Sequence, residues 1–154
     1  PGGRRRSMGY PLSIVRLKKG LTSTLPLMVG EGLANPLAGP FDGFTRARLS
    51  YAVGKFPFAA KLETGMRDTY EIEAPGGGRL EVWLTPDGHI FMDSQAGLEL
   101  VLSLYIELRN VCPDIAIEDP QRGVLHNAVS FKEFLCGEET AEKPLKAYVD
   151  EDAA

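Results

Sequence analysis

The side chains that could carry out chemistry are few in this sequence. Its 154 residues contain two histidines, His89 and His126, and two cysteines, Cys112 and Cys136. A cysteine–histidine nucleophile pair depends on contact in space, so the distances along the chain leave this chemistry open. Both cysteines end apolar segments, however, which favours a structural role as small buried hydrophobic side chains.

Other patterns of catalytic or ligand-binding residues are missing from the sequence. No serine stands between glycines at a strand-to-helix turn, as a nucleophile elbow requires. No close pair of cysteine or histidine residues has the spacing of a zinc site, and the acidic residues do not follow an EF-hand loop. Gly30-Glu31-Gly32 lacks the lysine and the third glycine of a phosphate loop. We therefore expect no metal, no cofactor and no enzymatic activity.

The elements that would position these side chains are clearest in the middle of the chain. Apolar and polar residues alternate through Thr69–Ala74 and Arg79–Thr85, and again from His89 to Asp93. A period of two is typical of half-buried strands, and Pro86-Asp87-Gly88 is a turn sequence. These segments predict a three-stranded antiparallel meander.

Alternation divides the side chains of this meander between two faces. The apolar face carries Tyr70, Ile72, Leu80, Val82, Leu84, Ile90 and Met92. The other face carries the candidate partner-binding residues Glu71, Glu73, Glu81, Trp83, His89, Phe91 and Asp93. Aromatic rings within an acidic rim suit the capture of a basic protein surface, because the rings bury area and the charges speed association. Two other interpretations stay open: an ordinary solvated sheet face, or a second core in which the first fifty residues cover Trp83.

A long apolar helix is predicted after the meander, from Gln95 to Val111. Its apolar residues recur at helical spacing and extend beyond one stripe, which is typical of a mostly buried helix. Glu99, Glu107 and Arg109 interrupt the apolar run, so the segment is not a membrane span. We expect this helix to cover the apolar face of the meander.

The flanking segments add further strands to the predicted sheet. They are Leu12–Lys18, Arg46–Gly54 and Phe56–Glu63 before the meander, and Ile115–Glu118 and Val124–Val129 after the helix. Ser130-Phe131-Lys132-Glu133 matches a capping box, which predicts a short helix from Phe131 to Leu135. The predicted fold class is α+β, with a mostly antiparallel sheet of about five to seven strands and one main helix packed on one face.

Composition and charge bound the organisation of the chain. We expect a single α+β domain over residues 8–137, preceded by a vector remnant or disordered arm (1–7) and followed by an acidic, solvated tail (138–154). The formal charge of −4 argues against a nucleic-acid partner. No secretory or membrane-spanning segment is present, so the expected location is the cytoplasm, away from membranes.

The stretch from Arg79 to Phe131 has a distinctive order of segments: Leu80-Glu81-Val82-Trp83-Leu84, then Gly88-His89-Ile90-Phe91-Met92, an apolar helix and Gly123-Val124-Leu125. In this order it resembles small bacterial immunity proteins that neutralise polymorphic toxins. The resemblance covers about a third of the chain and carries over no individual functional residue. It implies a non-enzymatic protein that binds one cognate toxin, here a basic toxin domain, and occludes its active site.

Two other functional interpretations remain. The first is a small-molecule-binding or enzymatic domain with a pocket between the sheet and the Pro/Gly-rich segment Thr22–Gly43, where His89, His126 or Arg46 would supply polar contacts. The second is an adaptor subunit that forms a homodimer through the acidic aromatic face, which a solution mass measurement would reveal.

Overall fold

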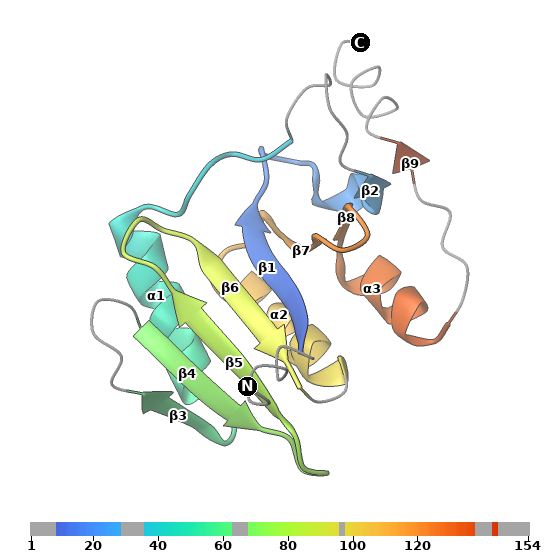
Figure 1. Ribbon diagram of the computed structural model, residues 1–154. Helices are drawn as coiled ribbons and strands as arrows, with labels where there is room; N and C mark the ends of the chain where they lie inside the picture. The colour runs from blue at the N-terminus through green and yellow to red at the C-terminus, as the bar shows by residue number, and fades with distance from the viewer. Residues whose placement is uncertain (1–8, 29–35, 63–67, 96–97, 138–142, 145–154) are drawn as a thin grey trace.

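The computed structural model shows one sheet with three helices packed against one of its faces (Figure 1). It describes residues 9–28, 36–62, 68–95, 98–137 and 143–144. The predicted arm at 1–7 lies outside the described residues, as does all of the predicted tail except two residues. The predicted α+β class with a mainly antiparallel sheet is confirmed.

The described part of the sheet has nine strands in the order β3-β4-β5-β6-β1-β7-β8-β2-β9. Eight of them pair in antiparallel fashion, while β9 lies parallel to β2. Their bounds are β1 Tyr10–Arg16, β2 Leu27–Met28, β3 Ala59–Leu62, β4 Asp68–Glu73, β5 Arg79–Leu84, β6 Ile90–Ser94, β7 Ile115–Asp119, β8 Val124–His126 and β9 Lys143–Pro144. The predicted number of five to seven strands was too low, because two-residue strands such as β2 and β9 leave no alternation to detect.

Strand β1 lies in the centre of the sheet, between β6 and β7. It pairs with β6 from Tyr10↔Ser94 to Ile14↔Ile90, and with β7 from Ser13↔Glu118 to Arg16↔Ile115. On one side the predicted meander β4–β5–β6 continues to β3 at the edge, and on the other lies the group β7, β8, β2 and β9. The first described strand of the chain therefore joins β6 to β7, two strands that lie much later in the sequence.

Helix α1, Gly43–Lys55, corrects the strand predicted over Arg46–Gly54. The alternation of Arg46, Arg48 and Ser50 with apolar neighbours suggested a period of two. The buried residues are instead Leu49, Ser50 and Val53, which follow the helical period. Asp42 begins the helix by accepting a hydrogen bond from the Thr45 amide at 2.8 Å.

Helix α2, Glu99–Val111, lies within the predicted main helix, but it does not cover the sheet alone. Helices α1 and α3, Ala128–Leu135, pack beside it on the same face. The N-cap of α3 is Asn127 rather than Ser130, because the Asn127 carboxamide accepts from the Ser130 amide at 2.9 Å. Ser130 is the third residue of the helix and completes a capping box, so the predicted strand over Val124–Val129 ends at His126.

Two apolar clusters lie on opposite faces of the sheet. The main cluster joins the predicted apolar face of the meander to Leu49 and Val53 of α1, the inner face of α2 and Phe131 of α3. The second cluster, on the other face, consists of Leu17, Leu25, Leu27, Ala116 and Leu125, with Val15, Leu21 and Leu37 packed against it. Leu25, Leu27 and Leu37 of the Pro/Gly-rich segment thus pack at the β7–β8–β2 end of that face.

The two sides of α2 should respond very differently to truncation. Leu104 is fully buried in the main cluster, whereas Ile106, two residues on, is 46% exposed. We predict that Leu104→Ala lowers the free energy of unfolding by about 2–5 kcal/mol, because it removes buried methyl groups and leaves a cavity. Ile106→Ala should change it by less than about 1 kcal/mol. Urea unfolding measures both, and equal losses would contradict this packing.

Candidate functional site

The face of β4, β5, β6 and β1 that the helices do not cover is termed the open face (Figure 1). Strand alternation and register place six of the seven predicted partner-binding residues on it: Glu71, Glu73, Glu81, Trp83, Phe91 and Asp93. The seventh, His89, directly precedes β6, and its ring lies near that of Phe91. The apolar face of the meander is buried under the helices, as predicted. The division of side chains between the two faces is therefore confirmed, whereas partner binding itself remains a proposal.

Three carboxylates form a row across the open face. Glu71 of β4 lies opposite Glu81 of β5, which lies opposite Asp93 of β6. Glu71 is ion-paired with Arg79 at 3.2 Å. Within the described residues, Glu81 and Asp93 have no ion pair. Like charges that face each other across strands destabilise a sheet, so this row costs the isolated protein folding free energy.

An aromatic row runs beside the carboxylates. The ring centroids of Trp83 and Phe91 are 6.0 Å apart, and the His89 ring also lies 6.0 Å from that of Phe91. Phe91 is 37% exposed and Trp83 is half-buried. Leu17, Leu25 and Leu27, from the first fifty residues, belong to the second cluster, which does not include Trp83. Because residues 1–8 and 29–35 lie outside the described residues, the covering of Trp83 by the first fifty residues stays a prediction.

A cavity of about 600 Å³ opens on this face between the aromatic row and the end of β7. It is termed the Glu118 hollow, and its walls include Pro11, Trp83, Phe91, Glu118 and Gln121. The register explains its position, because β1 pairs with β7 only from Ser13 onward, while its pairing with β6 continues to Tyr10. Pro11 lies before the part of β1 that pairs with β7. Because proline has no amide hydrogen to donate, no hydrogen bond to β7 is lost at this residue.

Gly9 permits a close approach at the rim of the hollow. A Cβ atom built on Gly9 would collide with the carboxylate of Asp93. The chain entering β1 thus lies directly against the acidic row. Any larger residue at this position would displace Asp93 from its place beside the hollow.

Glu118 is the residue of this site that sequence reasoning missed. In the sequence it stood out only as the last residue of the predicted strand Ile115–Glu118. In the sheet it lies between Ser13 of β1 and Leu125 of β8, at the border between the hollow and the second cluster. Burial raises the pKa of its carboxyl. The available signal was Glu118 directly after the apolar run Ile115–Ile117, but its neighbours depend on long-range pairing.

Neutralising Glu118 should stabilise the protein. Because the folded-state pKa lies above the ordinary 4.5, the charged carboxylate opposes folding at neutral pH, and protonation relieves this as the pH falls. We predict that Glu118→Gln raises the urea midpoint at about pH 7, and that the difference shrinks toward pH 4.5. Glu107→Gln, on the exposed side of α2, is the matched control and should leave the midpoint unchanged. A lower midpoint for Glu118→Gln would contradict this reasoning.

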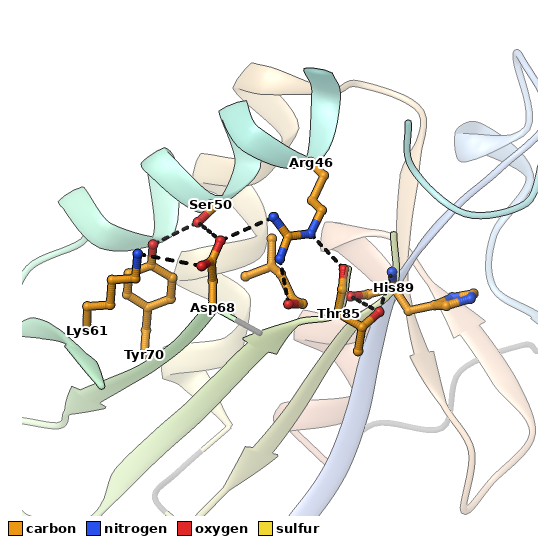
Figure 2. Close-up of polar contacts among 8 residues, drawn as sticks. Arg46, Ser50, Lys61, Asp68, Tyr70, Thr85 and His89 are labelled. Atoms are coloured by element: carbon orange, nitrogen blue, oxygen red, sulfur yellow. Dashed lines mark hydrogen bonds and ion pairs between the residues drawn. The ribbon is translucent and has the colours of Figure 1, made fainter. Parts of the chain in front are cut away.

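A polar network anchors α1 to the sheet (Figure 2). The Arg46 guanidinium donates to the carbonyl oxygens of Thr85 at 2.7 Å and Leu84 at 2.8 Å, and to Asp68 at 3.2 Å. The Ser50 hydroxyl lies 3.0 Å from the Asp68 carboxylate and 2.7 Å from the Tyr70 hydroxyl. Arg46 is thereby occupied by main-chain carbonyls and one carboxylate, which is the geometry of a structural anchor.

Asp68 ties this network together and makes its stability depend on pH. Burial raises the pKa of the Asp68 carboxyl, but the Ser50 hydrogen bond and the charges of Arg46 and Lys61 outweigh burial, so the net pKa is lowered. A lowered folded-state pKa contributes stability that is fully present above 3.8 and is lost as the pH falls through the folded-state value.

We predict that Asp68→Asn lowers the urea midpoint at about pH 7 and flattens its decline between about pH 5 and pH 2. The change removes the charge that Arg46 and Lys61 stabilise. Urea titrations over this pH range measure the effect. The urea midpoint of Glu107→Gln should follow that of the parent protein at every pH. If the midpoint of Asp68→Asn declined in parallel with that of the parent, the Asp68 carboxylate would not account for the loss of stability in acid.

The histidines and cysteines are dispersed. His126 is fully buried, with its Nδ1 2.9 Å from the Ser130 hydroxyl and its ring stacked on Phe134. Cys112 is half-buried and Cys136 is exposed, so the expectation of two buried cysteines was wrong for Cys136, which caps the end of α3. Burial raises the pKa of the Cys112 thiol, which disfavours the reactive thiolate. Within the described residues, no cluster of three or more His, Cys, Asp or Glu residues could hold a metal ion.

A pocket also lies between the sheet and the Pro/Gly-rich segment, but it is small. Its volume is about 90 Å³, and its lining includes His89 and Phe41 but neither Arg46 nor His126. Ligand pockets generally enclose about 300–1,000 Å³. Among the described residues, this pocket therefore does not bring His89, His126 and Arg46 together, and its volume lies below that range.

The comparison with known proteins found no matching family model, no similar curated protein and no similar solved structure. In the described part of the chain, no helix has the length and apolar character needed to span a membrane. The function must accordingly be argued from the open face itself.

Proposed function

We propose that this protein is a non-enzymatic binding protein that covers a basic surface of a partner protein with its open face. The observation that carries the proposal is the pairing of a carboxylate row, Glu71, Glu81 and Asp93, with an aromatic row centred on Trp83 and Phe91. Following the resemblance of Arg79–Phe131 to immunity proteins, we propose that the partner is a bacterial toxin domain and that binding occludes its active site.

The electrostatic cost of the carboxylate row supports this proposal. Glu81 and Asp93 face each other across two strands without an ion pair from the described residues. A partner that supplies lysine or arginine side chains would convert this repulsion into attraction on binding. The same charges would speed encounter with a basic surface, and the aromatic rings would provide buried contact area.

The dimensions of the site favour a protein surface over a small ligand. Neighbouring strands lie about 4.8 Å apart, so the three carboxylates extend over about 10 Å, and the aromatic row lies parallel to them. Charges and rings spread this widely over a sheet match several side chains of a macromolecule. An isolated small molecule would engage only part of them.

A toxicity assay tests the proposed function. We predict that a reading frame adjacent to this gene prevents growth when expressed alone in a bacterial host. Co-expression of this chain should restore growth, and the two proteins should co-purify as a stoichiometric complex. A harmless neighbour, or a toxic neighbour that this chain neither rescues nor binds, would overturn the immunity assignment.

Variants of the open face locate the binding site in the same assay. We predict that Trp83→Ala and Glu81→Lys abolish rescue and weaken binding by at least about 2 kcal/mol, as expected for interface hot spots. Glu81→Lys relieves like-charge repulsion with Glu71 and Asp93, so its loss of binding should occur without loss of stability. Two control variants change exposed residues on the helices. Phe44→Ala removes an aromatic ring from α1 and Glu107→Lys reverses a charge on α2, and both should retain rescue. Full activity of both open-face variants would exclude this face.

A further inference from the structure

We propose that the Glu118 hollow receives a single arginine side chain of the partner protein, stacked on Phe91 and Trp83 and ion-paired with Glu118. This inference rests on the proposed function and names the chemical group that would be recognised where the open face meets β7. It assigns the role of anion to a carboxylate that lies outside the acidic row of the meander.

The sheet register creates a seat for a flat cationic group. Trp83, Phe91, Ser13 and Glu118 lie opposite one another on β5, β6, β1 and β7, and all point to the open face. The small Ser13 stands between a large aromatic ring and a carboxylate. With strands about 4.8 Å apart, a group above Ser13 lies within contact distance of both neighbours.

The chemistry of the two walls favours a guanidinium group. One wall is aromatic, and a cation above such a ring is attracted by its negative face. The other wall is a carboxylate, which a planar guanidinium can contact with two parallel hydrogen bonds. Lysine offers a smaller, more strongly hydrated charge without a flat surface for stacking.

The surroundings of Glu118 explain why a cation would be held there. The second cluster lies on one side through Leu125, and the hollow lies on the other. The described residues supply no ion pair or hydrogen bond to its carboxylate, and burial raises its pKa. A partly desolvated carboxylate without a counter-charge attracts a weakly hydrated cation more strongly than a solvent-exposed carboxylate does.

Tryptophan fluorescence tests this inference without any partner protein. Trp83 is the only tryptophan in the sequence, so its emission reports directly on the hollow. The full chain is titrated at constant ionic strength with argininamide and with citrullinamide, which has nearly the same shape but an uncharged urea group. Argininamide should change the emission in a saturable manner, and citrullinamide should bind about tenfold more weakly.

Two substitutions locate the bound group. Glu118→Gln should weaken argininamide binding about tenfold, because it removes the carboxylate but keeps the side-chain shape. Ser13→Leu should also block binding by filling the floor between Phe91 and Glu118, whereas Glu107→Gln should leave the titration unchanged. Equal responses to the two amides, tighter binding of lysinamide, or an unchanged titration in Glu118→Gln would each overturn the inference.

The outcome is separable from that of the proposed function. If argininamide binds as described but no basic partner is found, the hollow is an arginine site and the immunity assignment fails. If the toxin binds the open face and Glu118→Gln neither weakens that complex nor alters the argininamide titration, the proposed function stands and the arginine assignment fails.

Discussion

The pairing of β1 with both β6 and β7 is the interaction on which the rest of this structure depends. Without it the meander and the β7–β8–β2 group would be two sheet fragments, each with an unpaired edge. The same strand supplies Leu12 and Ile14 to the main cluster on one face and Val15 to the second cluster on the other. It also supplies Ser13 and Pro11 to the hollow. The core and the candidate site are thus organised by one short segment.

The open face and the face that the helices cover differ in how their polar groups are paired. On the face that the helices cover, apolar side chains from α1, α2 and α3 fill the space above the sheet, and Arg46 donates to main-chain carbonyl oxygens. On the open face, carboxylates oppose one another, and Glu118 loses hydration without gaining a counter-charge from the described residues. Features that cost folding free energy in the isolated molecule gather on one surface, as expected where a protein prepares for a partner.

Local sequence pattern was sufficient for the meander and insufficient for its surroundings. Alternation from Thr69 to Asp93 identified the strands and assigned each side chain to its correct face, because those pairings are between neighbours in sequence. Alternation failed at Arg46–Gly54, where Arg46 and Ser50 are polar residues turned inward to a network that exists only when β4 and β5 are in place. The hollow could not be foreseen, since Ser13 and Glu118 are brought together by pairing across about a hundred residues.

That separation along the chain has a consequence for how the protein is made. During synthesis, β1 emerges early, but β7 follows only after the meander and α2 have been completed, and Tyr10 donates its 2.7 Å hydrogen bond to Asp119 across 109 positions. Contacts between distant segments form slowly because closing a long loop costs entropy before the contact is gained. The β4–β5–β6 hairpins can assemble on the ribosome, whereas the central strand finds its second neighbour only once residues 115–119 have left the exit tunnel. The pairing that builds the candidate site is therefore completed later than the meander and α2.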